Sequence, residues 1–386
     1  MSESKNDKIE QFLKMYSSPN TRKVYKASLH HFFNSVYGEG DLREQSERYF
    51  NEVKSRNIQD DIEKFFQSLS NKPPLTIRLR LTALKTFFIE NDLEFKEKFW
   101  RRIGGRIKGS RALTLDKVPS NEELKQILSH MNIQGKTLFT MLASSGMRIG
   151  ECLRLNLSDL EDGSPFRIKI RGETTKSGNS RITFISKEAV LLLNEWLKVR
   201  QDYLKSACNK ITGIHAKYPD KKWKASIKSI EDERVFPFEI QTAYLMWKSV
   251  LSKSGYLKKD SSTNRLTVHP HVLRKFFRTR LGAIIPVDVI EAIMGHEAYL
   301  SEVYRKYSFE QLGEFYQKGE HALTIFGAGE DVEKINQDIG ALWRENKQLK
   351  EDNIDLRNQV NEVKNELSEI RKLVDDLDRQ RRQGIN

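Results

Sequence analysis

The first hundred residues alternate apolar and polar positions with a helical period. One run of apolar side chains recurs at helical spacing at Val24, Tyr25, Leu29, Phe32 and Phe33. Ser18 and Pro19 precede this run as a capping hydroxyl and a proline at the first helical position, which is typical of a helix start. Similar patterns predict helices around residues 62–69 and 75–88, and no strand before residue 110. We therefore expect a small helical domain over residues 1–100.

Strand patterns appear only in the next part of the chain, residues 118–328. Helical patterns cover residues 121–131 and 138–145, whereas residues 166–170 and 181–186 alternate as strands around a turn that carries Lys176 near its tip. The predicted fold is thus mainly α with a small antiparallel β-sheet, in a mixed α/β domain over residues 118–328. The lysine-rich residues 201–235 fit no element and are interpreted as an insertion or an extended basic loop.

A strict seven-residue repeat begins at Val332. Its a positions are Val332, Ile339, Asn346, Asn353, Val360, Leu367 and Val374, and its d positions are Ile335, Leu342, Leu349, Leu356, Val363, Ile370 and Leu377. β-Branched residues at a with leucine at d favour a parallel dimer, and Glu345 and Lys350 have the g-to-e spacing that attracts between parallel copies. We expect a coiled-coil oligomerisation helix over residues 329–386. A helix from a different protein is the alternative partner.

The net charge of the chain indicates which class of partner it attracts. The chain of 386 residues carries a net charge of +13, and residues 332–386 are nearly balanced, so the surplus lies in the two predicted domains. Such a surplus attracts polyanions, of which nucleic acid is the first candidate. Only Cys152 and Cys208 occur, and no apolar run is long enough to span a membrane. These features predict a soluble intracellular protein with no membrane partner.

Basic side chains are dense between the two predicted domains. We interpret residues 101–117 as a basic interdomain linker whose glycines loosen the backbone. Cations in a flexible linker can contact DNA phosphates and release counterions, although an ordinary solvated linker has the same composition. The candidate DNA-binding residues are Arg101, Arg102, Arg106, Lys108 and Arg111.

Two short motifs carry candidate chemistry. In the first, GMRIGE at 146–151, Gly146 ends one helix, Arg148 begins the next, and Glu151 lies one turn later, close enough to orient the arginine. In the second, HVLRKFF at 271–277, His271 and Arg274 share one helix face. Two guanidinium groups can stabilise a phosphate in a transition state, and histidine can exchange a proton near neutral pH. His269 and His271 lack a third ligand, so no metal site is expected.

These motifs are followed by Gly295-His296 and by tyrosines at 304 and 307. The ordered set resembles the active-site signature of the tyrosine recombinases, the phage-integrase family of site-specific DNA recombinases. The resemblance implies that Lys176 protonates the leaving 5′ oxygen and that His296 donates a hydrogen bond to the phosphate. It also implies that a tyrosine forms a 3′-phosphotyrosyl link, with no metal or nucleotide cofactor.

The position of the candidate nucleophile differs by one residue from the family pattern. The family usually places its tyrosine nine residues after the histidine that His296 matches, and here that position is Arg305. Tyr304 lies eight residues after His296 and follows an apolar residue, as the family tyrosine often does. We therefore favour Tyr304 as the nucleophile, with Tyr307 as the alternative.

The resemblance also predicts partners and a role. It implies a core-binding domain that grips double-stranded DNA at specific recombination sites, and a tetramer on synapsed DNA. The predicted role is integration or excision of a mobile element in the cytoplasm of a prokaryotic cell. A chromosome-dimer resolvase or transposase with the same chemistry is the first alternative, and a non-catalytic architectural DNA-binding protein is the second. Residues 310–325 could pass to a neighbouring subunit, as the family's terminal helix often does.

Overall fold

The chain forms two compact units. The computed structural model describes residues 7–109, 113–217, 229–295 and 307–327, together with 348–349, 352, 355–356, 358–372 and 374. One unit comprises Met1–Leu115 with Asp260–Arg265, and the other comprises Asp116–Lys259 with Leu266–Asn386. The described part is mainly α-helical with one small antiparallel sheet, so the predicted fold class is confirmed at that level.

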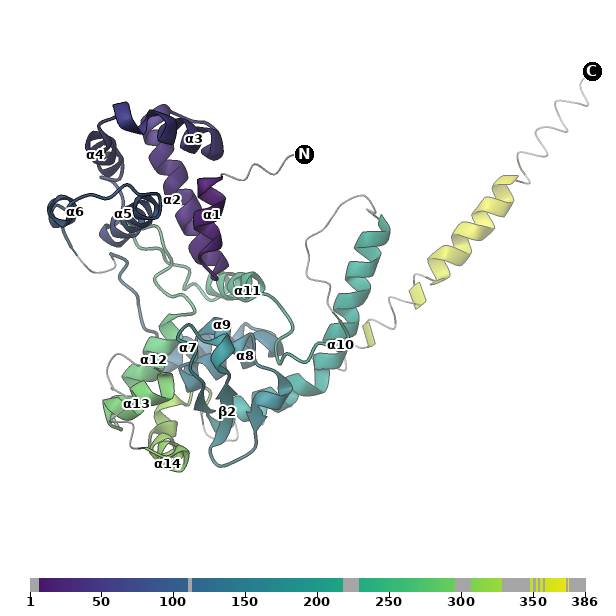
Figure 1. Ribbon diagram of the computed structural model, residues 1–386. Helices are drawn as coiled ribbons and strands as arrows, with labels where there is room; N and C mark the ends of the chain where they lie inside the picture. Colours follow the sequence, from purple (N-terminus) through teal and green to yellow (C-terminus); the bar gives the residue numbers. More distant parts are fainter. Residues whose placement is uncertain are drawn as a thin grey trace, which may run out of the picture. The chain divides into compact units, whose positions relative to one another are not determined.

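The described part of the first unit is built from helices. Ser18 caps the second of them by accepting a hydrogen bond from the Thr21 N–H at 3.3 Å, as its sequence predicts. The predicted helices around residues 62–69 and 75–88 are confirmed by α4 and α5. The elements are α1 (Lys8–Lys14), α2 (Pro19–Tyr37), α3 (Leu42–Glu52), α4 (Ile58–Ser68), α5 (Pro74–Ile89) and α6 (Glu97–Gly105), shown in Figure 1.

Aromatic side chains dominate the core of this unit. The ring of Phe32 on α2 lies 5.5 Å from that of Phe65 on α4 and 5.4 Å from that of Phe88 on α5, both nearly perpendicular. Edge-to-face pairs of this kind stabilise beyond the apolar area they bury. The other fully buried rings are Phe12, Phe33, Tyr49 and Phe87.

The start of the predicted linker belongs to this core. Residues 101–105 lie in α6, whose Phe99 and Ile103 are buried among the other helices, and Ile107 is buried beyond it. The expectation of a loosened backbone is therefore wrong for residues 101–105, because burial of the apolar face outweighs the weak helix propensity of Gly104 and Gly105. Arg111 lies outside the described residues.

The second unit contains the sheet and a larger set of helices. Its α8 is buried along its whole length and packs against α10, α12 and strand β3. Figure 1 shows α8 beside β2, whereas most of α10 projects away from them. The helices are α7 (Asn121–Ser129), α8 (Ile133–Ser145), α9 (Ile149–Cys152), α10 (Lys187–Lys217), α11 (Ile240–Lys253), α12 (Val272–Leu281), α13 (Val287–Met294) and α14 (Phe309–Gly319).

The predicted hairpin is present in the sheet. Strands β1 (Leu160–Glu161), β2 (Phe166–Ile170) and β3 (Arg181–Ile185) pair antiparallel in that order. In the β2–β3 register, Phe166 faces Ile185 and Ile170 faces Arg181. Strand β3 packs against both α8 and α13, so the hairpin is held from two sides.

The first part of the lysine-rich segment 201–235 is helical rather than an extended loop. Residues 201–217 continue α10, and Leu204 is fully buried. Trp196 on the same helix donates a hydrogen bond from Nε1 to the Val235 carbonyl at 2.9 Å, and Arg200 donates from Nε to the Arg234 carbonyl at 2.9 Å. The lysine-rich composition of this segment does not reveal these contacts, because a few apolar side chains and backbone carbonyls make them.

The end of the second unit packs on its own chain. Leu312 and Tyr316 of α14 are buried, and the Tyr316 hydroxyl donates to the Ser144 carbonyl at 2.8 Å. Beyond α14, Ile325 and Phe326 are also buried, and their N–H groups donate to Glu188 at 2.8 and 3.0 Å. In the single chain residues 310–325 thus pack on their own unit, and their passage to a neighbouring subunit stays a prediction.

The described parts of the C-terminal repeat are helical. Residues 358–372 form a helix that exposes apolar side chains at its a and d positions, including Val360, Val363, Leu367 and Ile370. Among the residues described in the two units and this segment, no helix is both long and apolar enough to cross a bilayer.

Candidate functional site

Arg148 is positioned by the turn that ends α8. Gly146 adopts a left-handed conformation (φ 63°), and a Cβ there would lie 2.5 Å from Cδ1 of Phe277, so both conformation and space require glycine. Arg148 then caps α9. Glu151 accepts the Arg148 backbone N–H at 2.9 Å and its Nη1 at 2.9 Å. The guanidinium is thus held at one edge, while the Arg148 side chain remains 38% exposed.

A second arginine reaches the same carboxylate. Arg181, the first residue of β3, donates from Nη2 to Glu151 Oε2 at 2.6 Å and from Nη1 to Oε1 at 3.3 Å. Burial by itself raises the pKa of Glu151, but the hydrogen bonds and charges of Arg181 and Arg148 outweigh it and lower the pKa overall. Glu151 is therefore a buried anion that joins two guanidinium groups.

Arg274 lies beside this pair in the interior. Its side chain on α12 donates to the carbonyl oxygens of Gly146 and Met294, the latter at 2.8 Å. Burial, followed by the positive charges of Arg148 and Arg181, lowers the pKa of Arg274 to about 10. The group stays protonated at neutral pH. The structure thus brings Arg148 and Arg274, two of the residues chosen from sequence, into one cationic cluster.

His271 precedes α12 at the edge of this cluster. Its ring stacks with that of His269 at a centroid distance of 6.3 Å. His269 in turn contacts Asp116 Oδ1 at 3.1 Å through Nε2, and Asp116 also accepts from Lys275. Desolvation, followed by the charge of Arg274, lowers the pKa of His271, so the imidazole is neutral at pH 7. A neutral imidazole can accept a proton.

Lys176 is exposed in the turn between β2 and β3. The turn is braced below it, because Arg154 donates from Nη1 to the Thr174 carbonyl at 2.9 Å. The structure therefore places Lys176 in the exposed turn at the end of the hairpin.

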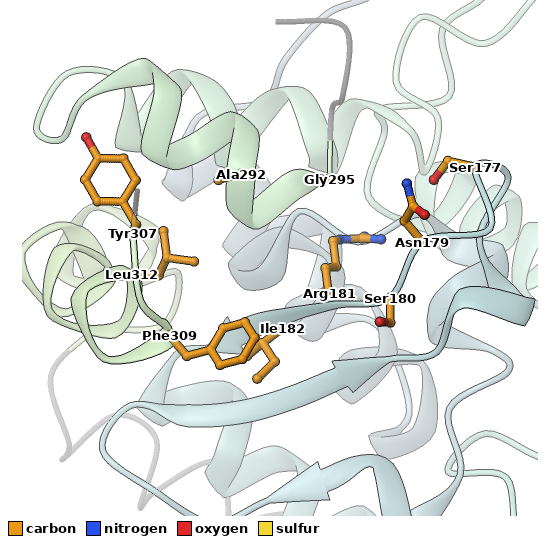
Figure 2. Close-up of a pocket in the computed structure, with 10 residues that line it drawn as sticks. All are labelled: Ser177, Asn179, Ser180, Arg181, Ile182, Ala292, Gly295, Tyr307, Phe309 and Leu312. Atoms are coloured by element: carbon orange, nitrogen blue, oxygen red, sulfur yellow. The ribbon is translucent and has the colours of Figure 1, made fainter. Parts of the chain in front are cut away.

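A groove runs from the hairpin turn to the start of α14. It has a volume of about 280 Å³ and is lined by Ser177, Asn179, Ser180, Arg181, Ile182, Ala292, Gly295, Tyr307, Phe309 and Leu312. Figure 2 shows Arg181 and Tyr307 at opposite ends, with the Tyr307 hydroxyl directed away from Arg181. That hydroxyl donates to Asp288 Oδ2 at 2.9 Å, and this hydrogen bond is the main reason that the pKa of Tyr307 is raised. A raised pKa makes a phenol a poorer nucleophile.

The two remaining sequence-predicted residues, His296 and Tyr304, lie outside the described residues. The chain reaches the first of them through Gly295, which ends α13 in a left-handed conformation (φ 71°). A Cβ at Gly295 would lie 2.6 Å from Cδ of Arg181. The end of α13 is thus packed directly on the arginine that contacts Glu151.

The candidate DNA-binding arginines of the first unit are paired with glutamates. Arg101 lies 3.1 Å from Glu97, whereas Arg102 and Arg106 lie 3.7 and 2.5 Å from Glu63. All three arginine side chains remain largely exposed, as does Lys108. Exposed ion pairs of this kind stabilise by at most about 1 kcal/mol, so a phosphate can replace the glutamate at little cost.

Sequence reasoning missed Arg181 and Asp116. Arg181 opens a strand directly after a polar turn, where an arginine is usually solvated, and only the burial of Glu151 makes it a partner. Its one sequence signal is its position at the start of a strand whose other residues, apart from Thr183, are apolar. Asp116 lies 153 residues from His269, so no local pattern could reveal the contact.

Known proteins are similar to this chain in sequence and in fold. The pattern of the phage integrase family matches residues 117–310, half of the chain. The tyrosine recombinase XerA of Pyrococcus horikoshii is 26% identical over 72% of this chain and 86% of its own length. The tyrosine recombinase XerC of Thermodesulfovibrio yellowstonii is 26% identical over 80% of this chain and 92% of its own length.

A solved structure adds a comparison of folds. The crystal structure of a lambda integrase dimer bound to a COC′ core site aligns with a TM-score of 0.50 and 13% identity, over 78% of this chain and 98% of that one. At this identity the alignment shows the fold alone. Together with the match over residues 117–310, it leaves one conclusion: the chain belongs to the phage integrase family, the tyrosine recombinases.

Proposed function

We propose that the chain cleaves and rejoins DNA strands at specific sites through a 3′-phosphotyrosyl intermediate, and that it integrates or excises a mobile element. The observation that carries the chemistry is the cluster of Arg148, Arg181 and Arg274, arranged around the buried anion Glu151 at the base of the hairpin. A cluster with this many cations in one place is suited to a phosphodiester.

Strand cleavage is a transesterification. The phenolic oxygen of Tyr304 forms a bond to the scissile phosphorus, and the bond from phosphorus to the 5′ oxygen breaks. The number of phosphate ester bonds is unchanged, so the step needs no external energy source. Attack by a 5′ hydroxyl of a second duplex on the phosphotyrosyl link reverses the reaction and joins the strands.

The arginines act on the charge of the phosphate. The pentacoordinate transition state carries more negative charge than the ground state, and fixed cations stabilise it preferentially. Arg148 presents an exposed guanidinium that Glu151 holds in place, and Arg274 acts from a buried position, where a charge is less screened by water. In this proposal the two form a clamp on the scissile phosphate.

Two proton transfers accompany the reaction. The Tyr304 phenol loses a proton, and His271, neutral at pH 7 because of its lowered pKa, is the proposed acceptor. The leaving 5′ oxygen gains a proton, and Lys176 at the hairpin tip is the proposed donor. His296 is proposed to donate a hydrogen bond to the phosphate.

Covalent capture of DNA tests this proposal. The protein is first used to select its own site from a library of duplexes, and that site is then prepared as a nicked suicide substrate. Wild-type protein should give an adduct that survives SDS, Tyr304→Phe should give none, and Tyr307→Phe should retain it. Loss with Tyr307→Phe alone would make Tyr307 the nucleophile. Absence of an adduct from wild type on a site that it binds would favour the architectural alternative.

The biological role is a separate question from the chemistry. A chromosome-dimer resolvase or a transposase would give the same adduct. Plasmids that carry the selected site once or twice distinguish the roles, because an integrase joins two molecules, whereas a resolvase deletes the segment between two sites of one molecule. Resolution of a two-site plasmid with no joining of one-site plasmids would contradict the integration role, whereas excision of a mobile element would give the same product as resolution.

We further propose that residues 329–386 form a parallel coiled-coil dimer, which precedes a tetramer on synapsed DNA. Support comes from the helix at 358–372, where the side chains of Leu367 and Ile370 are 60% and 56% exposed in the single chain. Large apolar side chains at heptad spacing favour a helical partner. The domain assignment, with a core-binding domain over residues 1–100 and a catalytic domain over 118–328, is part of the same proposal.

Sedimentation equilibrium tests the dimer. Ile370→Asp places a charge at a d position and should convert a dimer into a monomer. Lys372→Asp is the matched control, because it introduces the same side chain at an f position on the opposite face. A wild-type protein that is monomeric at micromolar concentration, or that dimerises equally well as Ile370→Asp, would rule out this interface.

A further inference from the structure

We propose that Arg181 is a positioning residue, which fixes the Arg148 guanidinium through Glu151 and ties the Lys176 hairpin to the end of α13. The proposal rests on the function proposed above and deepens it. Arg181 itself is assigned no contact with DNA. Three independent contacts, described in turn below, support this role.

The first contact is with the carboxylate that orients Arg148. Arg181 and Glu151 form a two-point pair, in which Nη2 and Nη1 of the arginine donate to the two separate oxygens of the carboxylate. A two-point pair fixes the plane of both groups, whereas a single hydrogen bond would leave the carboxylate able to rotate. Both side chains are largely excluded from solvent, with exposed fractions of 10% and 2%.

The fixed carboxylate in turn determines the position of Arg148. Each Glu151 oxygen accepts one hydrogen bond from Arg148 and one from Arg181. The Arg148 guanidinium therefore bonds to only one of the two oxygens, because the other accepts from its backbone N–H. Without Arg181, both oxygens would be open to the Arg148 guanidinium. The arginine would then turn toward Glu151 and away from a phosphate.

The second and third contacts lie at the end of α13. Arg181 donates from Nε to the Ile293 carbonyl at 3.2 Å, and its Cδ occupies the space that a side chain at Gly295 would need. Because Arg181 is also the first residue of β3, the strand that follows the Lys176 turn, one side chain links three segments. These are the hairpin, the start of α9 and the end of α13, which carry or adjoin three proposed catalytic residues.

Single-turnover cleavage on two substrates tests the proposal. One suicide duplex has an ordinary scissile phosphate and the other a methylphosphonate, which lacks one negative charge, so that its transition state presents less charge for a guanidinium to stabilise. Arg181→Met should slow cleavage of the phosphate by about 10- to 100-fold, since misplacement of a catalytic group by about 1 Å has effects of this size. On the methylphosphonate the loss should be several-fold smaller, and the protein concentration for half-saturation should be unchanged.

Two further variants make the result specific. Arg181→Lys keeps the charge but not the planar fork, so it should recover only part of the rate. Arg200→Met is the matched control, because Arg200 is also a buried arginine of the second unit but bonds to the carbonyls of Asp232 and Arg234. It should lower the melting temperature by a similar amount and leave the cleavage rate within about twofold.

The outcomes separate the two proposals. An equal loss on both substrates, or no loss, would overturn the positioning of Arg148 by Arg181 while leaving the recombinase chemistry intact. If Arg181→Met does not fold, Arg181→Lys decides by the same comparison of substrates. Failure of the proposed function itself would appear as wild-type protein that captures neither substrate.

Discussion

Two buried glutamates of the second unit behave in opposite ways. Glu151 and Glu188 are 2% and 5% exposed, and each accepts several hydrogen bonds. The donors to Glu151 include two guanidinium groups, and its pKa is lowered. The donors to Glu188 are the backbone N–H groups of Ile325 and Phe326, which offset burial only in part, so its pKa is raised to about 7.

The difference shows that burial alone does not determine the charge of a carboxylate. Two cations beside Glu151 compensate for the loss of hydration, and the resulting fixed anion can hold Arg148 and Arg181 in place. Glu188 instead changes charge near neutral pH and anchors the last buried residues of the unit. One glutamate supports the site, whereas the other supports the fold. The four predictions below test this contrast, from the largest expected effect to the smallest.

Loss of the charge at residue 151 should have the largest effect. Glu151→Gln leaves the buried Arg181 without its counter-charge, and we expect the free energy of unfolding to fall by about 3–5 kcal/mol. Glu188→Gln at pH 8 removes an unfavourable charge but also one acceptor, so its effect should stay within about 1 kcal/mol. Urea denaturation of both variants measures the contrast. Equal losses of unfolding free energy would contradict the distinction between Glu151 as a fixed anion and Glu188 as a group that titrates.

Removal of the exposed cation that Glu151 holds should affect chemistry more than stability. We expect Arg148→Ala to slow strand cleavage by about 10²- to 10³-fold, because a transition-state donor is lost. The melting temperature should change little, since the Arg148 side chain is partly exposed and Arg181 still neutralises Glu151. Single-turnover cleavage and thermal melting are measured on the same preparation. Full activity of Arg148→Ala would refute its place in the clamp.

The titration of Glu188 gives a pH dependence with a definite sign. Its pKa rises from the usual 4.5 in the unfolded chain to about 7 in the folded protein. The folded state therefore binds the proton more tightly, and the contribution of Glu188 to stability is largest below pH 4.5 and falls as the pH rises to about 7. The expected loss is on the order of 3 kcal/mol. The difference in unfolding free energy between wild type and Glu188→Gln isolates this contribution, and a difference independent of pH would contradict it.

The smallest effect concerns the tyrosine at the far end of the groove. Tyr307→Phe removes the hydrogen bond to Asp288, and we expect the free energy of unfolding to fall by about 1 kcal/mol. Cleavage should continue, because the hydroxyl points away from Arg181 and its pKa is raised. Asp288→Asn is a useful companion, since it weakens the same contact while keeping the phenol. Loss of the covalent adduct in Tyr307→Phe but not in Asp288→Asn would identify Tyr307 as the nucleophile.

Local signals in the chain predicted much of the fold and part of the site. Ser18-Pro19 marks the start of α2, the alternation at 166–170 and 181–186 marks the hairpin, and Gly146 marks the end of α8. The spacing of three residues between Arg148 and Glu151 likewise predicts their contact. Each of these depends on the conformation of a few neighbouring residues, and the helix and strand periods describe that conformation directly.

Other features depend on contacts between residues that are distant in sequence. Composition suggested a loose linker at 101–117 and an insertion or extended loop at 201–235, but burial of Ile103 and Leu204 places residues 101–105 in α6 and residues 201–217 in α10. The partnership of Arg181 with Glu151 spans 30 residues and that of Glu188 with Phe326 spans 138. The sequence by itself thus determined the family, most elements and the order of the candidate catalytic residues. The tertiary structure decided which polar side chains are buried together, because desolvation and charge pairing exist only once the chain is packed.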